Sequence, residues 1–292
     1  MIPQLQERYL KIIFSRKGFD ASNGKIPSPV FQDGSFCSIP ILSCHQTKLK
    51  DLEFFGRNLG RVVEQLSSGT IKADQNIHLD PDLNRKLIKR KSKWKPCFGQ
   101  VGAAQTHLEK MGVGVGDLFL FFGRFRNVQE EKHRFRYQKG SDDFHCIFGW
   151  LQVGKIFKPS TAGSKVPICF FDHPHVSDSS EYSSNNTLYI ASDQLTVPGL
   201  RKSIPRGGTF NLYTDKLRLT ASGKSRSIWK LPLFFYPGRK KPPLSFHSDL
   251  KHWKRSGQSV YLSTVGRGQE FVMDCTFYPE VLKWVKTLLA CY

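Results

Sequence analysis

The chain lacks the cysteine spacings that mark metal-binding or disulfide-linked folds. Its seven cysteines form no Cys-x-x-Cys pair and are irregularly spaced, which argues against a zinc ribbon or a disulfide framework. No stretch approaches the roughly 20 apolar residues of a membrane-spanning helix. The first ten residues carry Gln, Glu and Arg rather than the apolar run of a secretory signal. We therefore expect reduced thiols, a cytoplasmic location and no membrane partner.

The common signatures of catalysis and nucleotide binding are missing too. The sequence has no Gly-x-Gly-x-x-Gly after a predicted strand, no Walker loop, no Gly-x-Ser-x-Gly elbow and no zinc deaminase signature. No motif therefore indicates a cofactor, although Mg²⁺ is compatible with the carboxylates discussed below. The oligomeric state does not follow from the sequence.

Acidic residues are scarce relative to basic ones. The 292 residues include 44 Lys and Arg but only 24 Asp and Glu, which gives a net charge of +20. A field of this sign attracts phosphate backbones and speeds the encounter with them. A generic basic surface is the plainer alternative, but we favour DNA or a nucleotide as the partner. No basic amphipathic helix beside an apolar anchor points to a membrane surface.

The pattern of apolar residues predicts a strand-rich fold. Two aromatic and β-branched runs within residues 116–158 flank a basic connection, as is typical of two buried antiparallel strands. The second run, FGWLQVGKI, resembles strands of small PUA, EVE and ASCH barrels. Helices are expected at residues 49–66, 99–111 and 279–290, and further strands at 9–14, 35–41, 168–171, 187–191, 217–220, 227–231 and 271–273.

We predict an α+β fold, a mixed and strand-rich single domain over residues 1–292 with a few flanking helices. A PUA- or EVE-like small barrel element is expected around residues 116–157. Two sub-lobes, residues 1–158 and 159–292, are compatible with this prediction. The number of turn-forming residues, 24 Gly and 16 Pro, favours such a mixed architecture.

One segment combines carboxylates with an imidazole. His78, Asp80 and Asp82 suit acid–base catalysis or a divalent cation. Asp80 precedes Pro81, however, and this pattern is typical of a helix N-cap followed by proline at the first helical position. We favour the cap and keep the catalytic interpretation open, with Glu270 as another candidate acid–base group.

His173 and His175 offer two imidazoles within three residues. A metal site needs three or four ligands, and no further cysteine or carboxylate follows at a regular spacing. We interpret the pair as ordinary loop histidines and predict no metal site.

The loop after the first predicted strand is a candidate phosphate site. Ser15, Arg16, Lys17 and Asp20 stand around a glycine, where backbone amides and two cations suit a phosphate group. A surface turn with a local Asp20 ion pair is the alternative.

Amide side chains are candidates for reading a base edge. Gln100 and Gln105 lie in a stretch of small residues, Asn186 precedes a predicted strand, and Arg267 and Gln269 precede another. A carboxylate beside an amide suits an exocyclic amine. The alternatives are a tightly packed helix, a turn and a surface ion pair.

Aromatic and basic residues complete the candidate interface. Trp150 is expected to border a cavity where its indole N–H finds a partner, whereas Phe148 is assigned to the core. A basic run surrounds Trp94, which makes this ring a candidate for stacking outside the core. The residues expected on the nucleic-acid backbone are Lys89, Arg90, Lys93, Trp94, Arg124 and Arg126.

Several blocks of the sequence together resemble one known family. In chain order they are SRKGFD, GKIPSPVFQDG, HLDPDL, FGQVGAAQTHL, GVGVGDLFLFFGRF, FGWLQVGKI, NNTLYIA and RGQEFVMD. They span nearly the whole chain and resemble the nucleotide modification associated domain 3 family of bacteria and their phages. The resemblance implies a setting among enzymes that modify DNA bases. It implies no reaction and no catalytic residues.

We therefore expect a DNA-directed protein that recognises or processes a modified nucleobase. The base is expected in an aromatic- and amide-lined pocket, with Lys and Arg on the phosphate backbone. One alternative is a base- or nucleotide-modifying transferase or hydrolase that uses the Asp80, Asp82 and His78 cluster or Glu270. The other alternative is a non-catalytic interaction protein.

Overall fold

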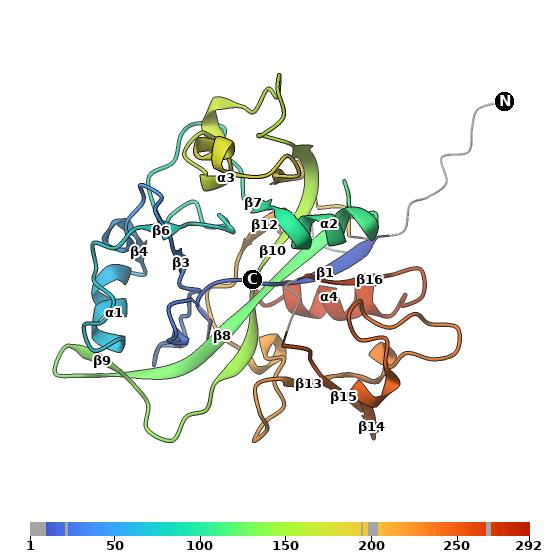
Figure 1. The fold of residues 1–292 in the computed structure, drawn as a ribbon. Helices are drawn as coiled ribbons and strands as arrows, with labels where there is room; N and C mark the ends of the chain where they lie inside the picture. Colours follow the sequence, from blue (N-terminus) through green and yellow to red (C-terminus); the bar gives the residue numbers. More distant parts are fainter. Residues whose placement is uncertain (1–9, 21–22, 194, 198–203, 267–269) are drawn as a thin grey trace.

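A large mixed sheet organises the computed structural model, which describes residues 10–20, 23–193, 195–197, 204–266 and 270–292 (Figure 1). Within these residues the sheet has nine strands. Its main path runs in the order β16 (Glu270–Asp274), β1 (Lys11–Arg16), β8 (Leu118–Glu131), β10 (Phe144–Phe157), β11 (Thr187–Ala191) and β7 (Cys97–Gln100). Off this path, β2 (Ser28–Val30) and β9 (Arg134–Tyr137) pair with β8, and β12 (Gly207–Thr209) pairs with β10. Only β1 and β2 run parallel to β8.

The antiparallel pair β8 and β10 confirms the strands predicted within residues 116–158. Leu118 to Phe122 are fully buried in sequence, without the alternation of a half-exposed strand, because both faces of the sheet are covered here. The register between β8 and β10 shifts by one residue at Phe148, which indicates a β-bulge. The strand predicted at 187–191 is found with the same ends, and those predicted at 9–14, 227–231 and 271–273 are found with shifted ends.

Several elements cover the sheet. They are α2 (Gly102–Lys110), α4 (Val281–Leu289) and a small sheet of β13 (Ile228–Pro232), β15 (Ser259–Ser263) and β14 (Trp253–Ser256). Phe14 on β1 contacts Trp229 on β13 and Trp284 on α4, with ring centroids 5.8 and 5.9 Å away. The helices predicted at 99–111 and 279–290 are thus confirmed. α4 buries an apolar face at helical spacing, whereas the buried residues of α2 are Gln105 and Leu108.

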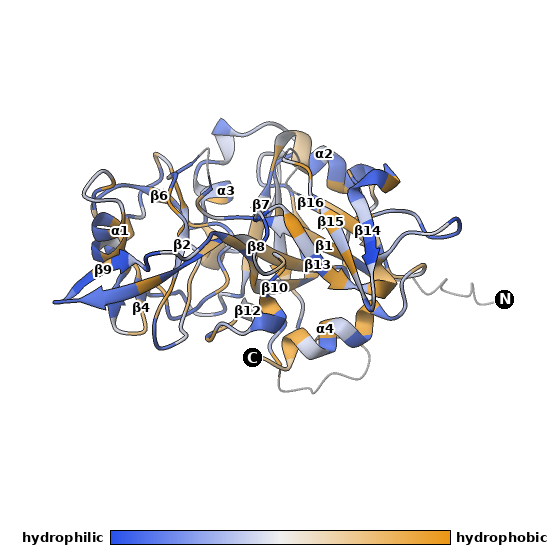
Figure 2. Cartoon of the chain, turned by 90° about the horizontal axis from the view of Figure 1, so that it is seen from below, coloured by the Kyte–Doolittle hydropathy of each residue, from blue (hydrophilic) through white to orange (hydrophobic). Residues whose placement is uncertain are grey.

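A second hydrophobic cluster lies beside the outer half of β8. It is formed by α1 (Leu59–Leu66), β3 (Ile41–Leu42), β6 (Ile77–His78), β4 (Glu53–Phe54), β5 (Arg57–Asn58) and their loops. Figure 2 shows that the tip where β8 meets β9 is hydrophilic, whereas the middle of the sheet is hydrophobic. The short α3 (Pro174–Ser177) lies over β7 and β11.

Single helical turns connect these elements. They are η1 (Leu49–Asp51), η2 (Ile168–Phe170), η3 (Ser179–Glu181), η4 (Asp215–Leu217), η5 (Leu233–Phe235) and η6 (Leu250–His252). None of the helices in the described ranges combines the length and apolar character that crossing a bilayer requires.

Only the C-terminal part of the helix predicted over residues 49–66 is an α-helix, α1. Gly56 has a φ of 71°, and Phe55 before it also has a positive φ, so the chain forms the tight hairpin of β4 and β5 there. The helix starts only at Leu59, because the Asn58 side chain caps it by accepting from Arg61 N. Phe55, an apolar residue within the predicted helix, is more than half exposed.

Three predicted strands are wrong. Residues 35 and 36 form isolated bridges and residues 37–40 are irregular, because Asp33 and Ser28 side chains take the backbone N–H groups of Ser35 and Ile39; Ile41 starts the two-residue strand β3. Residues 168–170 form η2, and Leu217 ends the single turn η4 before Arg218 and Thr220 form isolated bridges. Short apolar runs do not distinguish a strand from a buried turn.

The two end strands of the main path approach each other at one point. Gln100 at the end of β7 donates from Nε2 to Glu270 Oε1 at the start of β16, 2.6 Å away. The described residues show no hydrogen-bonded ladder between these strands, so the small barrel remains a prediction. The strand-rich α+β class is confirmed. The sheet combines strands from both sides of Lys158, and the division into two lobes there stays a prediction.

Candidate functional site

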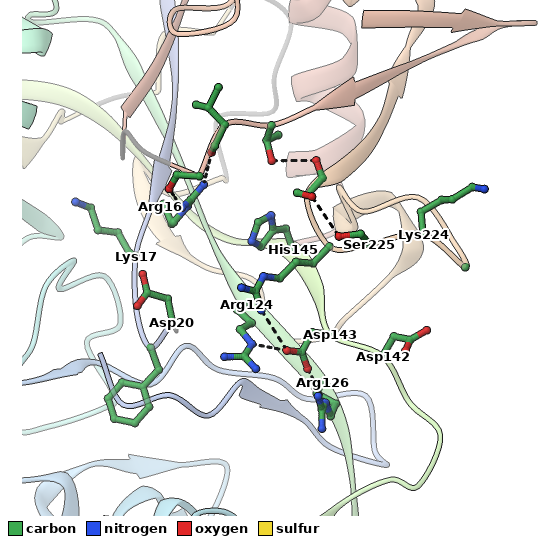
Figure 3. A pocket seen from close by; sticks show the side chains of 17 residues that line it. Arg16, Lys17, Asp20, Arg124, Arg126, Asp142, Asp143, His145, Lys224 and Ser225 are labelled. Carbon is green, nitrogen blue, oxygen red and sulfur yellow. Dashed lines mark hydrogen bonds and ion pairs between the residues drawn. The ribbon is translucent and has the colours of Figure 1, made fainter. Parts of the chain in front are cut away.

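A large cavity lies where β1 ends (Figure 3). Its volume of about 900 Å³ is at the upper end of the range typical of ligand sites, roughly 300–1,000 Å³. The charged side chains that line it are Arg16, Lys17, Arg124, Arg126, Lys224, Arg226, Asp20, Asp142 and Asp143. Six cations thus face three carboxylates, and we call this site the cationic cavity. It brings together Arg16, Lys17, Asp20, Arg124 and Arg126, all of which the sequence predicted as binding residues.

One carboxylate orients three of the arginines. Asp143 accepts from Arg126 Nε at 2.5 Å and from Arg124 Nε, and Arg226 Nη1 is 3.6 Å away. The Asp143 side chain is only 11% exposed, so these contacts are partly shielded from water. Because one negative charge serves three guanidinium groups, the arginines are held in place while an excess of positive charge remains.

Arg16 is held from the opposite wall. Its Nη1 and Nη2 donate to the carbonyls of Gly266 and Val265 at 3.1 and 3.3 Å. Its Nε is buried and has no partner among the described residues. Carbonyl contacts fix the guanidinium without neutralising its charge, which remains available to an anion.

His145 on β10 adds a neutral donor to the cavity wall. Trp229 Nε1 donates to His145 Nδ1 at 3.0 Å, so the proton of the neutral ring is on Nε2. Burial, reinforced by Arg16, Arg226 and Arg124, lowers the pKa of His145 to about 3. At neutral pH the ring therefore presents an N–H group without a charge.

Lys17 connects the cationic cavity to a buried carboxylate. Glu270 Oε1 accepts from Lys17 Nζ and Ser15 Oγ, both at 3.1 Å, and from Gln100 Nε2 at 2.6 Å. Lys17 Nζ also lies 4.4 Å from the centroid of Phe98. The second oxygen, Glu270 Oε2, is buried without a hydrogen-bond partner among the described residues. The candidates Ser15, Lys17, Gln100 and Glu270 therefore form one network.

The predicted helix cap at Asp80 is wrong. No helix follows Pro81; residues 80–82 instead cover the outer edge of β7, where Gly99 N donates to Asp80 Oδ1 at 2.7 Å. Burial favours the neutral form of Asp80, but His173, His175 and His78 outweigh it and hold the pKa of this carboxyl well below its usual range.

Asp80 is the centre of a histidine cluster. His78, Asp80 and His175 each offer a ligand atom within 4.8 Å of the others, and His173 Nε2 lies 3.3 Å from Asp80 Oδ1. Burial lowers the pKa of both His78 and His175 to about 4, so both rings are neutral at pH 7. The cluster unites two segments that are far apart in sequence, residues 78–80 and 173–175, and it contains the two histidines that sequence reasoning treated as ordinary loop residues.

Asp82 lies close by but has other partners. It forms an ion pair with Arg90 and accepts from Trp94 Nε1 at 3.1 Å, and Arg90 lies over the Trp94 ring, 4.9 Å from its centroid. The Asp82 and Arg90 side chains are 4% and 6% exposed. This arrangement places Trp94 in the interior, while Lys89 and Lys93 are exposed on the surface.

Other predicted residues lie apart from the cationic cavity. Gln105 accepts from Tyr189 Oη at 2.9 Å inside the fold. Trp150 is fully buried, donates to Pro205 O at 2.9 Å and packs on Phe210. Asn186 is buried beside the histidine cluster. The candidates Arg267 and Gln269 lie outside the described residues.

Sequence reasoning missed His145, Lys224 and Arg226 as cavity residues. The segment GKSRS at 223–227 is a basic, glycine- and serine-rich connection before a strand, a signal that was available for Lys224 and Arg226. No local signal distinguishes His145, which lies within an apolar strand and is assigned only by its contacts.

Comparison with protein families gives one clear result. The sequence profile of nucleotide modification associated domain 3 matches residues 11–274, a range that includes the charged residues of the cationic cavity, the Glu270 network and the histidine cluster. The comparisons with curated proteins and with solved structures give no significant match. The match extends over most of the 292 residues, so the chain belongs to the nucleotide modification associated domain 3 family.

Proposed function

We propose that this protein is DNA-directed and holds phosphate groups of DNA, or of a nucleotide, in the cationic cavity while a base is recognised or processed. The observation that carries the proposal is the surplus of six cations over three carboxylates around a space of about 900 Å³. Guanidinium groups match phosphate oxygens in charge and in hydrogen-bond geometry. His145 supplies a further donor that does not add to the charge.

The proposal places the base toward the Glu270 network. Lys17 lines the cavity and contacts Glu270, so a nucleotide whose phosphate lies among the arginines extends its base in this direction. Gln100 and Glu270 provide an amide beside a carboxylate, and this combination suits an exocyclic amine and its neighbour. Membership of a nucleotide modification family and the net charge of +20 support the same class of ligand.

Fluorescence anisotropy with labelled duplex and single-stranded DNA at several salt concentrations tests the proposal. The double variant Lys224→Ala/Arg226→Ala removes two cavity cations. We expect the slope of log K against log salt to fall by about 1 to 2, because each phosphate that the protein no longer neutralises reduces the slope by about 0.7 to 0.9.

The matched control is Lys216→Ala/Lys283→Ala, which removes two exposed charges outside the cavity lining. This variant keeps the wild-type slope if the cavity is the binding site. Equal reductions in both double variants would mean that net charge alone drives binding, and the cavity would have no special role.

A second candidate function is base or nucleotide modification with Glu270 as the acid–base group. Glu270 Oε2, which has no hydrogen-bond partner in the described part of the chain, favours it, because a buried oxygen without a donor is available to a proton or to a substrate N–H. Mass spectrometry of nucleosides from DNA incubated with the protein tests this function. A mass change with wild type that is absent with Glu270→Gln supports it, and unchanged nucleosides with wild type contradict it.

A further inference from the structure

We infer that His78, Asp80 and His175 bind a divalent first-row transition-metal ion. The inference goes beyond the proposed function, because it rests on side chains that do not line the cationic cavity. The ligand atoms come from β6, the segment that covers β7, and α3. They lie within 4.8 Å of one another, so small side-chain rotations bring them to the roughly 2.0–2.2 Å metal–ligand distances of such sites.

The hydrogen bonds of Asn186 prepare His175 as a ligand. Asn186 Nδ2 donates to Ser160 Oγ at 3.0 Å and to His175 O at 2.8 Å, which fixes the amide orientation. The Asn186 Oδ1, 2.6 Å from His175 Nδ1, is therefore an acceptor, and His175 Nδ1 carries the proton. His175 Nε2 consequently has a free lone pair, the arrangement found around metal-bound histidines whose second nitrogen donates to a carbonyl.

The surroundings fix the plane of the His175 ring. Tyr182 stacks on one side at 4.7 Å, with 5° between the rings. On the other side lies Gly99, where an added Cβ would be 2.1 Å from His175 Cδ2. A strand residue with no side chain is thus required for the ring to occupy this position.

Asp80 is oriented in a comparable way. Gly99 N donates to its Oδ1 at 2.7 Å. His173 accepts from His175 N at Nδ1, which puts its own proton on Nε2, 3.3 Å from Asp80 Oδ1. His173 is 3% exposed, and its Nε2 has no hydrogen bond of good geometry within the described part of the chain. A buried imidazole nitrogen 3.3 Å from the carboxylate supports the charged form that a metal needs.

The ligand set selects the class of ion. Two imidazoles and one carboxylate suit Mn²⁺, Fe²⁺, Co²⁺, Ni²⁺ or Zn²⁺, whereas Mg²⁺ prefers oxygen ligands alone. The three ligands His78, Asp80 and His175 include no cysteine, so no thiolate contact to the ion is expected. Three protein ligands leave at least one coordination position for water or a substrate atom.

Cobalt titration of the tag-free, chelator-treated full chain tests the inference, without DNA so that the result is independent of the proposed function. We expect one Co²⁺ per chain by equilibrium dialysis, visible d–d bands without a thiolate charge-transfer band, and a rise in Tm with added Co²⁺ or Zn²⁺. His78→Gln and Asp80→Asn should each weaken binding by at least about 100-fold.

Matched variants separate loss of a ligand from loss of the fold. Asp80→Asn keeps an acceptor for Gly99 N, and His133→Gln replaces a 94% exposed imidazole outside the cluster, which should leave binding unchanged. Circular dichroism confirms that each variant is folded. Three results would each overturn the inference: wild type takes up less than about 0.2 equivalents of Co²⁺, its spectrum shows a thiolate band, or folded His78→Gln binds Co²⁺ as tightly as wild type. If both ligand variants unfold, the wild-type stoichiometry and spectrum decide.

Discussion

Gln100 and Glu270 lie on the two end strands of the main sheet path, and Gln100 Nε2 donates to Glu270 Oε1 at 2.6 Å. The same oxygen accepts from Ser15 Oγ and Lys17 Nζ. One buried carboxylate therefore joins β7, β1 and β16, next to the cationic cavity. Its replacement should affect both the stability of the fold and the position of Lys17.

We predict that Glu270→Gln lowers the free energy of unfolding by about 2 kcal/mol. The amide cannot accept the Lys17 ammonium as strongly, and a hydrogen bond to a charged group contributes roughly 1.5–3 kcal/mol. Urea denaturation followed by circular dichroism measures the change. Glu131→Gln, on an exposed part of β8, is the control and should change stability by less than about 0.5 kcal/mol.

A second prediction concerns Asp82. Asp82→Asn leaves Arg90 buried without its counter-ion, and breaking such a pair costs roughly 3–5 kcal/mol. DNA binding by the folded variant should be unchanged, because the pair does not line the cationic cavity. Asp172→Asn is the matched control, since it breaks a surface pair with Lys91, worth at most about 1 kcal/mol. Equal costs for the two variants would contradict a structural role for Asp82.

Stability should fall in mildly acidic solution. Burial lowers the pKa of His145 to about 3 and of His247 to about 4, from 6.5. Between about pH 6.5 and 4 the unfolded chain then binds more protons than the folded one, so the free energy of unfolding rises with pH in this window and levels off above it.

Urea denaturation at pH 7, 5.5 and 4.5 measures this dependence, and wild type should lose stability steadily. His145→Gln should lose less between pH 7 and 4.5, by an amount on the order of 2 kcal/mol. An identical pH dependence in wild type and variant would show that His145 does not carry the effect.

We predict that Gly99→Ala both destabilises the fold and prevents metal binding. Its Cβ would lie 2.1 Å from the His175 ring, and overpacking of this kind typically costs about 1–3 kcal/mol. Thermal unfolding and cobalt titration measure the two effects. Gly238→Ala is the control, because no atom lies within 4 Å of its added Cβ; unchanged cobalt binding in Gly99→Ala would speak against the assigned ring position.

The sequence predicted the long central strands, two helices and several short strands, and it failed where turns or caps interrupt an apolar run. The strands at 116–158 and the C-terminal helix have strong periodicity, and the structure contains both. The helix over 49–66 failed because a glycine turn and an asparagine cap divide it. Gly56 and Asn58 are visible in the sequence, but the helical spacing of apolar residues on both sides of them favoured one long helix.

The candidate site was predictable only where its residues are neighbours in sequence. Arg16 and Lys17 are adjacent at the end of β1 and were found together. Glu270 reaches them only through the pairing of β1 with β16, and it is 255 residues from its partner Ser15. The histidine cluster joins residues 78, 80 and 175. Such a set appears only when the segment at 80–82 covers the edge of β7, and the expected helix cap predicted a different path for that segment.

Neighbouring residues of β7 face two different sites. Gly99 seats the His175 ring and donates to Asp80, while the Gln100 side chain points across to Glu270. Since successive residues of a strand project to opposite faces, a small twist or slide of this strand alters both environments together. If the proposed metal and the proposed nucleotide both bind, the two occupancies are thermodynamically linked through β7, and the factor by which one ligand changes the affinity of the other is the same in both directions.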